Sequence, residues 1–170
     1  MPEADPRPPL ALDADTINFL EGPVSIVIAA RGDDLVAPMV QAVGCRANAD
    51  GTVSLCVNRE QGIDVLAAID AHHAIAVVFC QPSTVETLQL KSFDARWRPA
   101  AVLDHAVAKR YSAALGEDLV SIGFGGDYAD AILGVTDDLV VIQFTPHEAY
   151  RQTPGPHAGA ALECARRGAR

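Results

Sequence analysis

Apolar and polar residues alternate along several stretches of this chain, which is the pattern of β-strands that bury one face. The clearest case is residues 87–93, where Leu88 and Leu90 point to one face while Gln89 and Lys91 point to the other. Five more stretches have the length and composition of strands: residues 24–30, 35–46, 52–58, 74–80 and 138–145.

Three stretches have the period of an α-helix instead: residues 13–20, 61–71 and 99–115. The third is predicted to begin with Pro99 in its first turn and to end at Gly116, because these residue types favour those positions. Its apolar stripe consists of Leu103, Val107, Tyr111 and Leu115. The glycines among residues 119–133 favour loops with short helical pieces.

The elements follow the order β-β-β-α-β-β-α-β. Short polar turns such as Ala49-Asp50-Gly51 join the first three strands, so we expect these strands to form an antiparallel meander. Pro38 marks an edge position or an irregularity in the second strand. The predicted fold class is therefore mainly β: a small six-stranded antiparallel barrel with peripheral helices.

A single domain is expected to account for most of the 170 residues. The proline-rich residues 1–12 are predicted to be a flexible N-terminal arm, residues 13–160 the barrel domain, and residues 161–170 a frayed C-terminal tail. Within residues 150–159, prolines and glycines favour an extended or turning path, which we expect to close over a site or a partner subunit.

The net charge of −9 argues against a nucleic-acid-binding protein, which needs a basic surface for phosphates. No apolar run is long enough for a membrane helix, and no secretory signal is evident, so we expect a cytoplasmic protein without a membrane partner. The four cysteines form no CxxC pair and are expected to be reduced thiols. No metal site is predicted, since adjacent His72 and His73 would point about 100° apart on a helix.

The polar face of residues 87–93 has two interpretations. Thr87, Gln89 and Lys91 form either an ordinary solvated face or a row of donors for an anionic, hydrogen-bonding ligand. In the second interpretation, lysine supplies the charge and glutamine supplies the amide.

Three stretches resemble the FMN-binding split-barrel family that includes pyridoxamine 5'-phosphate oxidase, and in particular a small uncharacterised subgroup. Residues 21–27 resemble the opening strand of small members. Residues 74–79, followed by residues 87–91, resemble the central strand pair. Residues 152–159 resemble the C-terminal segment of that subgroup. The resemblance runs from about Phe19 to Gly159 and implies a split β-barrel.

The resemblance also implies an FMN groove at a homodimer interface and an oxidoreductase that acts on a small-molecule redox substrate. FAD, a deazaflavin or haem are the other cofactors considered. Carried over by position, the cofactor-binding residues are Gln41, Val43, Arg46, Val57, Asn58, Arg59, Gln89 and Lys91. Each also has a purely structural interpretation: Asn58, for example, is a candidate helix cap, and Arg59 a candidate partner for Glu60.

One departure from the family is plain. The oxidases carry a Ser-Arg-Lys phosphate clamp after the third strand, and this chain has Asn58-Arg59-Glu60-Gln61 there. A flavin carrier or sensor without robust turnover therefore stays open as an alternative. So does a haem-binding barrel with His147 or His157 as axial ligand, and so does a barrel without ligand that acts as a dimeric interaction protein.

Overall fold

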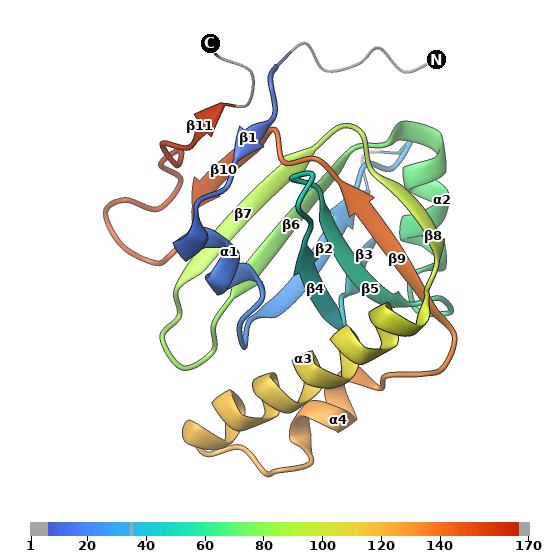
Figure 1. The fold of residues 1–170 in the computed structure, drawn as a ribbon, viewed down its shortest axis with the longest axis vertical. Helices are drawn as coiled ribbons and strands as arrows, with labels where there is room; N and C mark the ends of the chain where they lie inside the picture. The colour runs from blue at the N-terminus through green and yellow to red at the C-terminus, as the bar shows by residue number, and fades with distance from the viewer. Residues whose placement is uncertain (1–6, 35, 167–170) are drawn as a thin grey trace.

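Two antiparallel sheets face each other across the core of the computed structural model, which describes residues 7–34 and 36–166 (Figure 1). The five-stranded sheet has the order β10 (Glu148–Arg151), β7 (Thr87–Ser92), β6 (Ile75–Cys80), β2 (Ser25–Ala30) and β3 (Met39–Gln41). The four-stranded sheet has the order β4 (Gly44–Ala47), β5 (Val53–Asn58), β9 (Leu139–Phe144) and β8 (Arg96–Pro99).

Within the described residues, the chain passes from one sheet to the other four times. The crossings from β3 to β4 and from β9 to β10 are corners within bent strands. At the first, the amide of Ala42 donates to Ile26 of β2, and the next amide, Val43, donates to Cys56 of β5. The single strand predicted over residues 35–46 is therefore wrong: it is two strands, β3 and β4, that pair in different sheets. The predicted three-strand meander is broken at the same place, because β2 pairs with β3 and β6 while β4 pairs with β5.

The second corner lies between β9 and β10, where the amide of His147 donates to Lys91 of β7. If each bent strand is counted once, the long strands are β2, β3–β4, β5, β6, β7 and β9–β10. Strands β2, β5, β6, β7 and β9 match five of the six predicted strands, whereas the sixth, over residues 35–46, is divided, and β10 lies beyond the predicted end of the last one. The mainly β, antiparallel fold class is confirmed, since all described strand pairs run antiparallel.

The described helices are α1 (Ala14–Leu20), α2 (Ile63–His72), α3 (Val102–Ser121) and α4 (Tyr128–Leu133). Asp13 caps α1, with its carboxylate accepting from the amide of Thr16 at 2.8 Å. The third helix differs from the prediction at both ends. Pro99 belongs to strand β8, and the helix runs through Gly116 because α4 packs against it there, with a Cβ on Gly116 coming 3.5 Å from that of Ala129.

Strand β8 was not predicted. Arg96, Trp97 and Arg98 alternate across the strand, and they pair with Gln143, Ile142 and Val141 of β9. One of the four residues in the predicted apolar stripe of α3 also needs revision: Leu103 is 57 % exposed, whereas Val107, Tyr111 and Leu115 are buried.

The core lies between the inner faces of the two sheets and includes Phe79, Leu90, Ile142 and Phe144, all at most 1 % exposed. Strand β5 is buried on both faces, because α3 covers the outer one. A Cβ on Gly44 would come 3.2 Å from the Ala108 backbone of α3, so the glycine of β4 permits this close approach.

The two ends of the described chain lie together beside β10 (Figure 1). Strand β1 (Leu10–Ala11) pairs with β11 (Ala165–Arg166), and Leu10 is buried. Paired strands thus occupy parts of the predicted flexible arm and frayed tail. Residues 1–6 and 167–170 of those two segments lie outside the described residues.

Helix α3 is tied to the five-stranded sheet by Tyr111, whose buried hydroxyl donates to the carbonyl of Val24 at 2.6 Å. We expect Tyr111→Phe to lower the free energy of unfolding by about 1–2 kcal/mol, because the carbonyl loses its hydrogen-bond partner. Urea denaturation measures this change. Tyr128→Phe is the control, since Tyr128 is 39 % exposed; equal effects of the two substitutions would contradict the prediction.

Candidate functional site

One row of side chains crosses the outer face of the five-stranded sheet. The strand register places Gln41, Val27, Val78, Gln89 and Tyr150 opposite one another on five adjacent strands. These side chains are half-buried or exposed, whereas the residues between them along each strand face the core. The two glutamines are three strands apart, roughly 14 Å.

The next row on this face consists of Met39, Ala29, Ala76, Lys91 and Glu148. Small and apolar side chains thus form a strip over β2 and β6, and polar side chains lie on β7 and β10 beside it. The ammonium group of Lys91 is 4.0 Å from the carboxylate of Glu148 and 5.0 Å from the ring centre of Tyr150. We call the two rows together the sheet platform.

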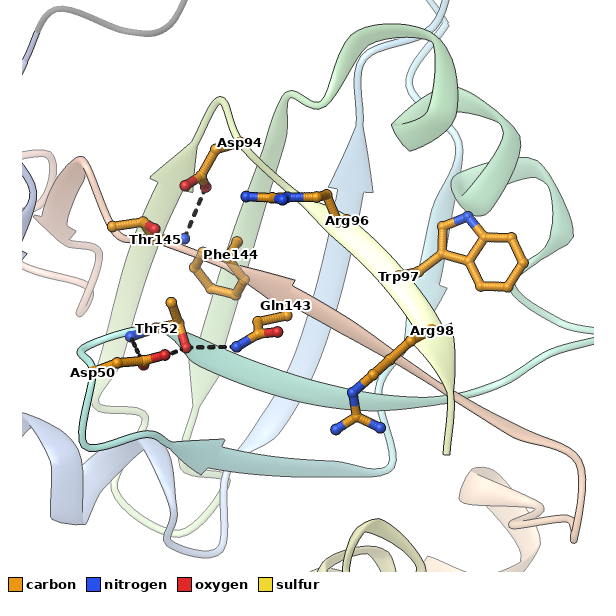
Figure 2. A pocket seen from close by; sticks show the side chains of 9 residues that line it. All are labelled: Asp50, Thr52, Asp94, Arg96, Trp97, Arg98, Gln143, Phe144 and Thr145. Carbon is orange, nitrogen blue, oxygen red and sulfur yellow. Dashed lines mark hydrogen bonds between the residues drawn. The ribbon is translucent and has the colours of Figure 1, made fainter. Parts of the chain in front are cut away.

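A second group of polar side chains lies on the outer face of the four-stranded sheet (Figure 2). Here the register places Arg96, Gln143, Ser54 and Arg46 in one row across β8, β9, β5 and β4. A cavity of about 320 Å³ opens beside this row. Its lining residues are Asp50, Thr52, Asp94, Arg96, Trp97, Arg98, Gln143, Phe144 and Thr145.

Asp104 of α3 binds two of these arginines. Asp104 is 2 % exposed. Its carboxylate accepts hydrogen bonds from Arg98 at 2.7 Å and 3.3 Å and lies 3.7 Å from the guanidinium of Arg46. Burial by itself raises the pKa of Asp104, but the hydrogen bonds from Arg98 and the Ala101 amide, together with the charges of Arg98 and Arg46, lower it overall. Asp104 is therefore an anion that fixes the start of α3 to β8 and β4.

Solved structures share this fold although no family model matches the sequence and no curated protein is similar to it. HupZ from group A Streptococcus superposes with a TM-score of 0.53 and 12 % identity, over 88 % of this chain and 100 % of HupZ. An F420 reductase superposes with a TM-score of 0.54 and 15 % identity, over 81 % and 98 %.

A third solved structure, a putative pyridoxamine 5'-phosphate oxidase from Lactobacillus delbrueckii, superposes with a TM-score of 0.50 and 10 % identity. The superposition covers 82 % of this chain and 93 % of the other. The fold is the pyridoxamine 5'-phosphate oxidase-like split barrel. At these identities the likeness establishes the fold and no activity.

This split barrel brings together three of the eight residues predicted to bind a cofactor. Gln41, Gln89 and Lys91 all belong to the sheet platform. The side-chain amide of Gln41 lies 3.4 Å from the hydroxyl of Ser25, and Gln89 accepts from Gln152 at 3.3 Å. The chain segment that follows β10 therefore contacts the platform at Gln89, and its predicted closure over a site or a partner subunit stays a prediction.

Two predicted residues are interior. Val43 and Val57 have no exposed surface, and β5 is paired with a strand on each side. Arg46 is also separate from the platform, since it lies on the other sheet in the row of Arg96, Gln143, Ser54 and Arg46, which we call the arginine row.

Asn58 and Arg59 have structural partners at the end of β5. The buried amide of Asn58 donates to Leu133 and Gly134 and accepts from Thr136, so it holds the loop between α4 and β9. Arg59 pairs with Asp138 at 2.9 Å and not with Glu60. Its guanidinium also lies 5.5 Å from the ring centre of Trp97.

The two histidines considered for haem differ in exposure. His147 is 6 % exposed, and its Nδ1 is buried without a hydrogen-bond partner among the described residues. His157 is exposed within a turn. In the part of the chain that the structure describes, no group of three or more metal-ligating side chains gathers, and no helix has the length and apolar character to cross a bilayer.

Sequence reasoning missed the arginine row because it missed β8. The signal was available: Arg96 and Arg98 flank Trp97 with the period of a strand, directly before Pro99. The second strand of the row, β9, was predicted, but the alternation of Gln143 with apolar neighbours was not used.

The ion pairs of Asp104 predict a pH dependence of stability. Because the pKa of Asp104 in the folded state is lowered, its contribution is fully present above about pH 4 and is lost as the pH falls through the folded-state value. We expect Asp104→Asn to be less stable at pH 7 and to lose less stability than the wild type on acidification from pH 4.

Urea denaturation at a series of pH values measures both effects. The matched control is Asp127→Asn, which removes one exposed carboxylate. An unchanged slope below pH 4 in Asp104→Asn would show that Asp104 is not the group responsible.

Proposed function

We propose that this protein binds a flavin-type cofactor on the sheet platform, with FMN as the first candidate, and works as an oxidoreductase on a small molecule. The observation that supports it is the register of the platform, which places Gln41 and Gln89 in one row with an apolar strip between them. The split-barrel fold, shared with an F420 reductase and a putative pyridoxamine 5'-phosphate oxidase, agrees with this choice.

The apolar strip suits a flat aromatic ring system. Val27, Ala29, Ala76 and Val78 form a surface with short side chains that are half-buried or exposed. Val27 is 36 % exposed although it lies on the central part of the sheet. A planar ligand placed there removes apolar surface from water without entering the core.

Polar groups at the margin of the strip suit the edge of a flavin. A glutamine amide offers one acceptor and two donors, which matches the alternating donors and acceptors of a pyrimidine-type ring edge. Lys91 adds a positive charge on β7, next to Gln89 along the strand face. Glu148 lies 4.0 Å from the Lys91 ammonium and competes for it until an anionic ligand group takes its place.

A second chain is part of the proposal. Arg46 and Arg59 are the other cations among the predicted cofactor-binding residues. Arg46 lies on β4 and Arg59 follows the end of β5, so both are away from Lys91 of β7 within one chain. A phosphate needs two or more charge-assisted donors. We therefore propose a homodimer in which the platform of one chain faces its partner and the phosphate contacts come from both chains.

Bound flavin would supply the acceptor for a hydride, and the side chains of this protein would hold it, shield it from water and orient the substrate. No described residue has to act as an acid or a base for that step. Turnover is the difference between an enzyme and a flavin carrier, so steady-state oxidation of a reduced nicotinamide cofactor distinguishes the two.

The first test is the absorbance spectrum of the purified protein, before and after incubation with FMN, FAD, F420 or haem and removal of free ligand. We expect bands near about 370 and 450 nm from oxidised flavin, whose chromophore the platform holds. A Soret band near about 410 nm would replace the proposal by haem binding. If the protein stays colourless with every ligand, the remaining interpretation is a barrel without ligand that acts as a dimeric interaction protein.

Lys91→Ala tests the phosphate contact. We expect FMN affinity to fall by about tenfold while riboflavin affinity stays unchanged, because riboflavin lacks the phosphate that lysine would bind. Fluorescence titration measures both. Lys109→Ala, which removes an exposed lysine of α3, is the matched control. Equal losses for the two ligands would contradict the assignment of Lys91.

Val27→Asp tests the second chain. A carboxylate in the middle of the platform is expected to convert a dimer to a monomer and to abolish flavin binding, because it would be buried without a partner. Sedimentation equilibrium at micromolar concentration measures the mass. Val102→Asp is the control, since Val102 is 88 % exposed at the start of α3. A wild-type protein that is already monomeric would sink the two-chain site.

A further inference from the structure

The cavity beside the arginine row is separate from the sheet platform and has its own chemistry. We call it the arginine groove and define it by Asp50, Thr52, Asp94, Arg96, Arg98 and Gln143 (Figure 2). Its volume of about 320 Å³ lies at the small end of the range for metabolite sites. It belongs to the four-stranded sheet, whereas the platform belongs to the other sheet.

The floor of the groove is held rigidly by hydrogen bonds. The Gln143 amide donates to the hydroxyl of Thr52 at 2.8 Å, and that hydroxyl donates to Asp50 at 2.7 Å. Asn48 also donates to the Thr52 hydroxyl, at 2.9 Å. One N–H of the Gln143 amide remains for a ligand, since the nitrogen carries two and Thr52 takes one.

Two guanidinium groups supply the positive charge of the groove. Arg98 is positioned by Asp104, as described above. Arg96 is exposed, and its guanidinium makes no hydrogen bond or ion pair within residues 7–34 and 36–166. A guanidinium on a sheet strand that is not engaged by its neighbours is a ready contact for a carboxylate or phosphate.

Two carboxylates supply negative charge to the same groove. Oδ1 of Asp94 accepts from the Thr145 amide at 2.8 Å and from the Ser92 hydroxyl at 2.7 Å. Burial raises the pKa of Asp94, but these hydrogen bonds and the neighbouring His147 lower it overall, so the group is charged at neutral pH. Asp50 is oriented by the amide and hydroxyl of Thr52.

We propose that the arginine groove binds a small dipolar molecule that carries a carboxylate or phosphate group and a protonated amine. The acid group meets Arg96, Arg98 and the free N–H of Gln143. The amine meets the carboxylates of Asp94 and Asp50. A ligand with both charges matches a lining in which two arginines and two aspartates occur together.

Ligands with one sign of charge fit this lining less well. A dianion would lie beside Asp50 and Asp94 on a protein whose net charge is −9, and a dication would lie beside Arg96 and Arg98. Like charges held at close range in a partly enclosed cavity are unfavourable. The lining therefore selects for charge pattern and not only for charge.

The test is a titration followed by ¹H–¹⁵N correlation spectra of the full chain at constant ionic strength. The dipolar probes are 4-aminobutyrate and O-phosphoethanolamine, and the probes with one sign of charge are succinate and putrescine. We expect saturable shifts of the Gln143 side-chain amide and the Thr52 and Thr145 backbone amides with at least one dipolar probe. The two dipolar probes show whether carboxylate or phosphate is the acid group.

The Gln81 side-chain amide is an internal control, because it donates to Ser83 and Asp118 at 3.2 Å and Gln81 is not among the residues that line the groove. Its signal is expected to keep the same chemical shifts throughout each titration. Succinate or putrescine binding as tightly as both dipolar probes would overturn the proposal. So would the absence of saturable shifts with all four probes.

Two substitutions test the opposite charges. Arg96→Gln and Asp94→Asn are each expected to weaken the dipolar probe at least about tenfold, since each removes one charged contact. Arg110→Gln, at an exposed arginine of α3, is the matched control and is expected to change affinity by less than about twofold. An equal loss in Arg96→Gln and Arg110→Gln would show that only net charge matters and would overturn the site.

Because Asp94 also holds the Thr145 amide, the unfolding midpoint of Asp94→Asn is measured alongside. Arg96→Gln breaks no hydrogen bond of the folded protein. If Asp94→Asn is unstable, the affinity of Arg96→Gln for the dipolar probe therefore decides whether the proposal stands. Flavin absorbance is expected to be the same in both variants. The groove is therefore tested independently of the flavin proposal, and either one can fail alone.

Discussion

The fold depends on two consecutive amides that donate into different sheets. Ala42 completes the ladder with β2, and Val43 begins the ladder with β5. Both side chains are fully buried, so the corner is set by packing as well as by hydrogen bonds. Successive side chains of a strand point to opposite faces of the sheet. A slip of one residue at this corner would therefore move the core residues of one sheet to its surface.

The corner also explains why the two faces of this protein differ. Beyond it, α3 covers β4 and β5 and leaves only the margin of the four-stranded sheet open, where the arginine groove lies. Before it, the outer face of the five-stranded sheet leaves Val27, Ala29, Ala76 and Val78 half-buried or exposed. One sheet thus carries a rigid polar cavity and the other a broad apolar surface with polar edges.

Local patterns were sufficient for the elements whose burial is simple. Residues 87–93 alternate cleanly because one face of β7 packs on the core, and α1 has a side-chain cap that can be read from the sequence. The same reasoning failed where distant contacts decide. Gly116 continues a helix because α4 packs on it, and residues 35–46 split because two sheets compete for their amides.

Site residues divide along the same line. Strand alternation placed Gln89 and Lys91 on one face, and the structure places Gln41, predicted from the resemblance, on the same face through β2 and β6. Asn58 has a structural role that sequence cannot distinguish from a ligand contact, because its buried amide anchors a loop. Asp104 was overlooked, since an aspartate early in a helix looks like an ordinary capping residue until its two arginines are seen.

Pairing of β1 with β11 has a consequence for how the chain folds. The two strands lie at opposite ends of the described sequence, so their contacts close the longest loop in the molecule. Such contacts carry the largest entropic penalty and form after local ones. Leu10 is therefore expected to stay exposed to solvent until the rest of the barrel is in place, which makes the N-terminal segment the natural point for a chaperone or a protease to act on the newly made chain.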